Sequence, residues 1–74
     1  MKFFIQEANH GFHKGRRYVV EASDEEAANR YFDNSRMLEA TVDVLPDAHP
    51  DQAVELKPVS GIEGVTAAAR IYPR

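Results

Sequence analysis

The sequence contains no cysteine among its 74 residues. This absence excludes a disulfide framework, a thiol nucleophile and a thiolate metal site. Because small secreted domains usually depend on disulfides, we expect the chain to work in a reducing compartment, the cytoplasm.

A long apolar run is also missing. The chain begins MKFFIQEANH, in which only Phe3, Phe4 and Ile5 are consecutive apolar residues before Gln6 and Glu7. Three residues are too few for the hydrophobic region of a signal peptide or for a membrane span. The run therefore predicts a β-strand, and we expect no membrane association.

The sequence has fewer basic than acidic residues, and its net charge is −3. Residues 1–37 hold six Lys or Arg against six Asp or Glu, whereas residues 38–74 hold three against six. A protein that binds nucleic acid non-specifically normally has a basic surface, and a nucleic-acid mimic would be more acidic than this. Direct binding to nucleic acid is therefore not expected.

Catalytic motifs are lacking as well. The glycines of SGIEG, Gly61 and Gly64, have neither the spacing nor the lysine of a phosphate loop and predict turns. In DAHPD, residues 47–51, His49 stands between Asp47 and Asp51, but no nucleophile or second polar cluster lies nearby. We therefore expect no catalytic residue, no cofactor and no enzyme activity.

Patterns along the first half of the chain predict two strands and a helix. Residues 2–8 and 18–22 are β-favouring, with Tyr18, Val20 and Ala22 on one face of the second strand. Ser23 and Glu26 have the spacing of a capping box, which predicts a helix from there to about residue 34. Its apolar stripe should pack on the sheet, and it consists of Ala27, Ala28, Tyr31 and Phe32.

The second half predicts further strands. Residues 38–44 alternate between apolar and polar side chains, and the prolines of PDAHP predict a loop after them. Residues 54–57 are a possible strand that Pro58 confines to an edge. For residues 66–71 a short helix and a final strand are both open, and the glycines before and Ile71-Tyr72-Pro73 after favour the strand.

These elements predict a single α+β domain over residues 1–74, in ββαβββ order. We expect an antiparallel sheet of three to five strands with the helix on one face. Phe4 and Val19 point to the other face and would form an exposed apolar patch unless the tail or a second subunit covers it. A chain this short gains from pairing, so we predict a homodimer through Phe4 and Val19.

The loop between the first two strands is the most unusual stretch. It reads HGFHKGRR, residues 10–17, and is longer than a tight hairpin turn. Its candidate ligand- or partner-binding residues are His10, Phe12, His13, Lys14, Arg16 and Arg17. The cations and glycine-freed amides suit a phosphate with Phe12 stacking on a base, or equally an acidic protein partner. A merely solvated loop is the third interpretation.

His10 and His13 have a spacing that occurs in metal sites. Because Lys14, Arg16 and Arg17 beside them would repel a cation, we expect no metal there.

The layout of residues 1–33 resembles that of many small bacteriophage-encoded proteins, some of which inhibit host defence. The resemblance rests on MKFF, a glycine-containing hairpin, and YVVEASDEEAANRYF as strand, capped start and helix. It implies stoichiometric binding in the host cytoplasm and carries over no functional residue.

Two modes of action follow from the resemblance. One is inhibition of a host nucleic-acid-targeting complex, as anti-CRISPR proteins do, with the acidic back half in a basic channel and the loop as anchor. The carboxylates in question are Glu39, Asp43, Asp47, Asp51 and Glu55. The other is sequestration of a cyclic or linear nucleotide immune signal by the basic loop. Net negative charge favours the protein target, and a structural or regulatory module remains a third reading.

Overall fold

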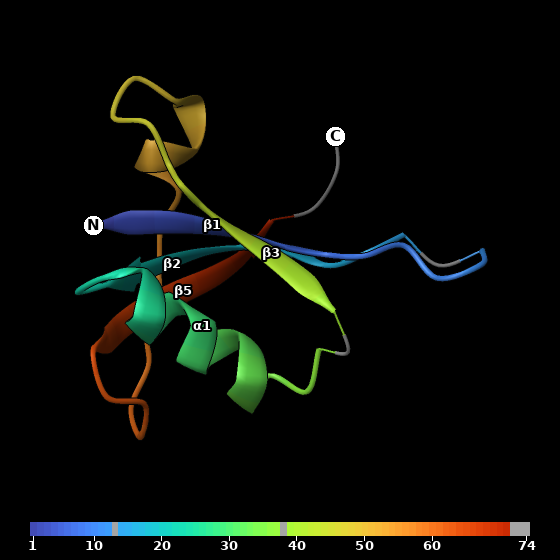
Figure 1. Cartoon of the computed structure of the whole chain (residues 1–74). Helices are drawn as coiled ribbons and strands as arrows, with labels where there is room; N and C mark the ends of the chain where they lie inside the picture. The colour runs from blue at the N-terminus through green and yellow to red at the C-terminus, as the bar shows by residue number, and fades with distance from the viewer. Residues whose placement is uncertain (13, 38, 72–74) are drawn as a thin grey trace.

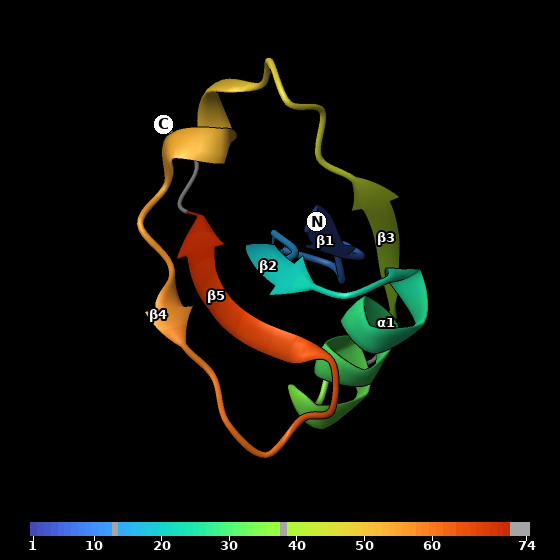
Figure 2. The same cartoon turned by 90° about the vertical axis from the view of Figure 1, so that its left-hand side faces the viewer.

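The computed structural model describes residues 1–12, 14–37 and 39–71. Within these ranges the chain forms one sheet with strand order β3-β1-β2-β5-β4, in which every pair of neighbours is antiparallel (Figure 2). The element order confirms the α+β class and the predicted ββαβββ arrangement. The elements are β1 (Lys2–Glu7), β2 (Arg17–Ala22), α1 (Glu25–Asn34), β3 (Ala40–Val44), the 3₁₀ helix η1 (Pro50–Ala53), β4 (Lys57–Pro58) and β5 (Val65–Ile71).

One face of the sheet carries the main core. Phe3 pairs with Val20 in the β1–β2 register, so alternation places Phe3 and Ile5 on the same face as Val20. All three are at most 1% exposed, and they pack with Ala27 and Ala28 of α1. Figure 1 shows α1 lying below the sheet on this face, as the apolar stripe predicted.

The start of α1 differs from the prediction by one residue. Asp24, not Ser23, is the N-cap: its backbone is extended and its carboxylate accepts a hydrogen bond of 2.8 Å from Ala27 N. Ser23 is tied to a distant turn instead, since its backbone N donates to Gly64 O at 2.8 Å. The path of the chain out of β2 therefore decides which residue caps the helix.

The C-terminal half resolves two open expectations. Residues 65–71 form strand β5, which pairs along most of β2, so the strand interpretation is correct and the short helix is wrong. The possible strand over residues 54–57 is shifted and shortened to Lys57–Pro58, and the chain before it forms η1. Pro58 lies at the sheet edge, where its missing N–H costs no ladder hydrogen bond.

The face opposite α1 is covered by the chain itself. The segment from Leu45 to Leu56, which includes η1, arches over β1 on the side away from α1 (Figure 1). Val19 is 0% exposed, Leu45 is 2% exposed, and Phe4 is half-buried with its ring centroid 4.9 Å from that of His49. Lys2 Nζ donates to Gln52 O and holds η1 down.

Phe4 and Val19 therefore form no exposed apolar patch, because residues 45–56 cross this face. The prediction assigned its cover to the tail or a second subunit, because nothing local marks residues 45–56 as a lid. Self-association itself stays a prediction, now without Val19 as a free contact residue.

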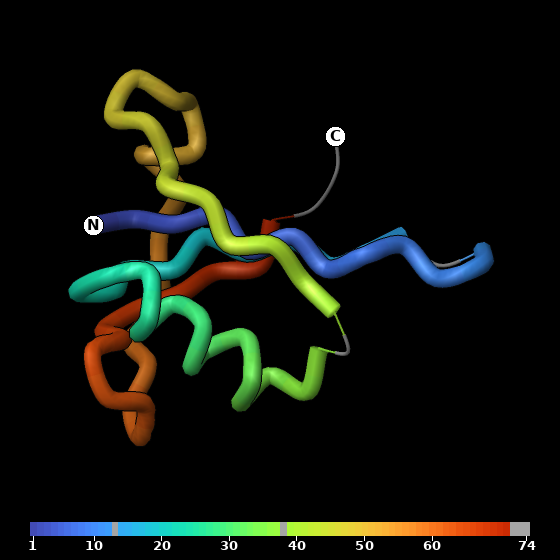
Figure 3. The backbone as a smooth tube through the Cα atoms, in the orientation of Figure 1, coloured from blue at the N-terminus to red at the C-terminus, as the bar shows by residue number. Residues whose placement is uncertain are grey.

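The hairpin that joins β1 to β2 extends well beyond the body of the domain (Figure 3). No helix within the described ranges is both long and apolar enough to cross a membrane.

Candidate binding site on the β1–β2 hairpin

The base of the hairpin is braced by an ion pair between Glu7 and Arg16. Arg16 Nε and Nη2 donate to Glu7 Oε1 and Oε2 at 3.0 and 2.7 Å, and Arg16 N donates to Oε1 at 3.2 Å. These hydrogen bonds lower the pKa of Glu7 from 4.5 to about 2 and raise the pKa of Arg16. Arg16, predicted as a binding residue, thus has its charge balanced within the hairpin.

Backbone contacts order the loop beyond this pair. Glu7 N donates to Arg16 O at 2.8 Å, and Gly15 N donates to Asn9 Oδ1 at 2.6 Å. Gly15 lies so close to the opposite strand that a Cβ there would stand 1.7 Å from Glu7 O. Gly11 has φ +58°, the left-handed backbone that a turn needs. Gly15 therefore allows the close approach of the two strands, and Gly11 allows the turn.

The far end of the hairpin presents an aromatic ring to solvent. Phe12 is 106% exposed, and His10 and Lys14 beside it are also exposed. His13 lies outside the described residues. Aromatic side chains are enriched in the contact surfaces between proteins, so Phe12 is the candidate contact residue at this end of the hairpin.

Arg17 lies on the opposite face of the hairpin from Arg16, because neighbouring residues of a strand point to opposite faces. Its guanidinium carbon stands 5.4 Å from the centroid of the Phe4 ring, in a cation–π contact. The predicted cluster of three cations is therefore divided between the two faces, with Arg16 on one and Arg17 on the other.

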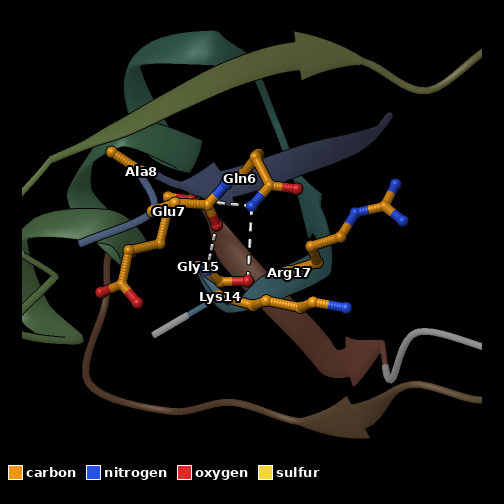
Figure 4. Close-up of a pocket in the computed structure, with 7 residues that line it drawn as sticks. Gln6, Glu7, Ala8, Lys14, Gly15 and Arg17 are labelled. Carbon is orange, nitrogen blue, oxygen red and sulfur yellow. Dashed lines mark hydrogen bonds between the residues drawn. The ribbon is translucent and has the colours of Figure 1, made fainter. Parts of the chain in front are cut away.

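A hollow of about 340 Å³ lies beside the hairpin base. In Figure 4 the side chains of Lys14 and Arg17 extend on the same side of it, whereas Glu7 extends away. Gln6 Nε2 spans the two strands by donating to Glu7 O at 2.7 Å and Gly15 O at 3.4 Å. The lining residues are Gln6, Glu7, Ala8, Asn9, Lys14, Gly15 and Arg17.

Of these, sequence reasoning missed Gln6, Glu7 and Asn9. The sequence did contain a signal for Glu7. An acidic residue at the end of one strand and an arginine at the start of the next face each other across a hairpin in one register only.

His49 has a structural role in the described chain. Its Nδ1 accepts a hydrogen bond of 3.1 Å from Asp51 N and so caps η1, while its ring packs edge-on against Phe4. The Asp51 carboxylate is 3.7 Å from Nδ1. Among the residues that the structure describes, no three His, Cys, Asp or Glu side chains come together as a metal site.

The carboxylates of the acidic half are largely available to solvent. Glu39, Asp43, Asp47 and Glu55 are exposed and Asp51 is half-buried.

No protein-family model, curated protein or solved structure matches the chain.

Proposed function

We propose that this chain is a non-enzymatic protein that binds one macromolecular partner stoichiometrically through the tip of the β1–β2 hairpin. The observation that carries the proposal is Phe12, 106% exposed at the end of a projecting hairpin. Aromatic side chains that enter a pocket of the partner supply a large share of the free energy of protein association.

The construction of the hairpin supports this use. The Glu7–Arg16 pair and the Asn9–Gly15 hydrogen bond order its base before any partner arrives. An ordered loop loses less conformational entropy on binding than a mobile one, so more of the contact free energy remains as affinity. Lys14, which is exposed and close to Phe12 in the sequence, favours a partner pocket with an acidic rim.

The specific form that we propose is an inhibitor of a host nucleic-acid-targeting complex, acting in the host cytoplasm. The phage-like layout of residues 1–33 suggests it, and the exposed carboxylates Glu39, Asp43 and Asp47 suit a basic nucleic-acid channel. The hairpin would then anchor the protein while its acidic surface blocks the channel.

A second candidate is sequestration of a phosphate-bearing nucleotide. The hollow beside Lys14 and Arg17 favours it, because two cations line a space large enough for a small ligand.

Partner recovery with two matched variants tests the main proposal. Tagged wild type, Phe12→Ser and Val44→Ser are recovered from host cells and examined by native mass spectrometry, with circular dichroism as a check on the fold. Val44 is the control because it is a second exposed apolar residue, 52% exposed on β3. We expect a 1:1 complex with wild type and Val44→Ser that is lost with Phe12→Ser.

Retention of that complex by Phe12→Ser would overturn the assignment of the tip. A protein that carries no macromolecule at all would favour a structural module or the nucleotide candidate.

A further inference from the structure

Lys14 and Arg17 are the two cations that line the hollow without a carboxylate partner among the described residues. We propose that they form a binding site for the phosphate group of a small ligand such as a nucleotide. This inference rests on the second candidate function and is independent of the docking role of Phe12.

The charge around the hollow supports an anion. Glu7 is the one acidic residue among those that line it, and both of its oxygens accept hydrogen bonds from Arg16. In Figure 4 this carboxylate also points away from Lys14 and Arg17. The remaining lining residues are neutral, so the hollow is locally positive in a chain whose net charge is −3.

Arg17 is held in a suitable position. Its guanidinium lies over the Phe4 ring at 5.4 Å, and that ring is fixed in turn by His49. Stacking on an aromatic face leaves the N–H groups at the edge of the guanidinium plane free to donate to phosphate oxygens. Because Arg17 is half-buried, an anion there would be less screened by water than at a fully exposed cation.

Lys14, which precedes Arg17 in the loop, supplies the second contact to the phosphate. Gly15 and Gln6 keep the two strands close at this point through the Gln6 hydrogen bonds to both. A point charge from lysine and a planar fork from arginine are a common pair of phosphate ligands. The volume of about 340 Å³ lies at the lower end of small-molecule sites and leaves room for more than a bare phosphate.

Titration by ¹H–¹⁵N NMR tests the site. The probes are inorganic phosphate, adenosine monophosphate and uncharged adenosine, each added at constant ionic strength to the whole chain. Expected are saturable shifts of the Gln6, Gly15 and Arg17 amides with both phosphates and none with adenosine. Equal affinity for both phosphates would identify a general phosphate site, and tighter binding of the nucleotide would show additional contacts to the nucleoside.

Variants separate the site from general attraction to positive charge. Lys14→Gln and Arg17→Gln should each weaken binding by about tenfold, whereas Lys57→Gln, an exposed lysine on β4, should leave it unchanged. Lys14 is exposed, so Lys14→Gln keeps the test valid even if Arg17→Gln disturbs the fold. Absent or unsaturable shifts, or equal weakening by all three variants, would overturn the inference. None of these outcomes depends on whether Phe12→Ser loses a protein partner.

Discussion

Arg16 and Glu7 face each other across the base of the β1–β2 hairpin and share two parallel side-chain hydrogen bonds of 3.0 and 2.7 Å. The pair shows that the cations of the basic loop, residues 10–17, do not all have the same surroundings. Arg16, which the sequence predicts as a binding residue, pairs with Glu7 at the hairpin base, and its role in binding stays a prediction. Lys14 and Arg17 line the hollow beside the pair.

Removing this pair should weaken the fold. We expect Arg16→Gln to lower the free energy of unfolding by about 1 kcal/mol, since the pair is partly solvent-screened with Arg16 34% exposed. Urea denaturation of Arg16→Gln, Glu7→Gln and the double variant measures it. Additive losses in that cycle would mean that the two side chains do not interact.

The same contact makes charge reversal a poor probe of binding. The sequence predicts that Arg16→Glu with Arg17→Glu leaves the fold intact, because both residues lie outside the predicted core. In the structure, Arg16→Glu would place a second carboxylate beside Glu7, so the substitution acts on stability as well as on any ligand.

Stability should fall in acid because of Glu7. Its pKa is lowered to about 2 in the folded chain from 4.5, so its contribution is complete above pH 4.5 and is lost as the pH falls towards 2. We expect a loss of about 1 kcal/mol over this range, as for Arg16→Gln, because the same partly solvent-screened pair is broken when Glu7 is protonated. Denaturation of wild type and Glu7→Gln at several pH values measures it, and parallel curves would contradict the assignment.

The two loop glycines should respond differently to alanine. In Gly15→Ala the new Cβ would overlap Glu7 O, so the strands must separate and we expect a loss of about 3 kcal/mol. Gly11→Ala meets open space and only has to adopt φ +58°, at a cost of about 1 kcal/mol. Thermal unfolding compares them, and a larger loss at Gly11 would show that the close approach is wrong.

Val19 should behave as a core residue. Because it is 0% exposed within the single chain, Val19→Ala should lower the free energy of unfolding by about 2 kcal/mol, against less than about 0.5 kcal/mol for the exposed Val44→Ala. Sedimentation of wild type and Val19→Ala tests the predicted homodimer in the same samples. A folded Val19→Ala that sediments as a smaller species than wild type would restore Val19 as an association residue.

Local pattern was enough for most elements. β-favouring residues predicted β1 and β2, alternation predicted β3, and the apolar stripe with an acidic start predicted α1 to within a residue or two. These features depend on side chains two to four positions apart, which the sequence displays directly. The projecting basic loop was predicted for the same reason, since two β-favouring stretches surround glycines and polar residues.

Only the tertiary structure decided which groups far apart in the chain meet. Residues 45–56 cross the face opposite α1 and place His49 against the Phe4 ring, a contact that depends on the path of the chain over the sheet. The N-cap is Asp24, and the backbone N of Ser23 donates to Gly64 O, some forty residues later. Residues 65–71 became a strand because β2 offered an unpaired edge.

The candidate site divides in the same way. The sequence by itself determined that a cationic, aromatic loop exists, because composition is local. Strand register alone decided that Arg16 meets Glu7 while Arg17 turns to Phe4, since one step along a strand reverses the face to which a side chain points.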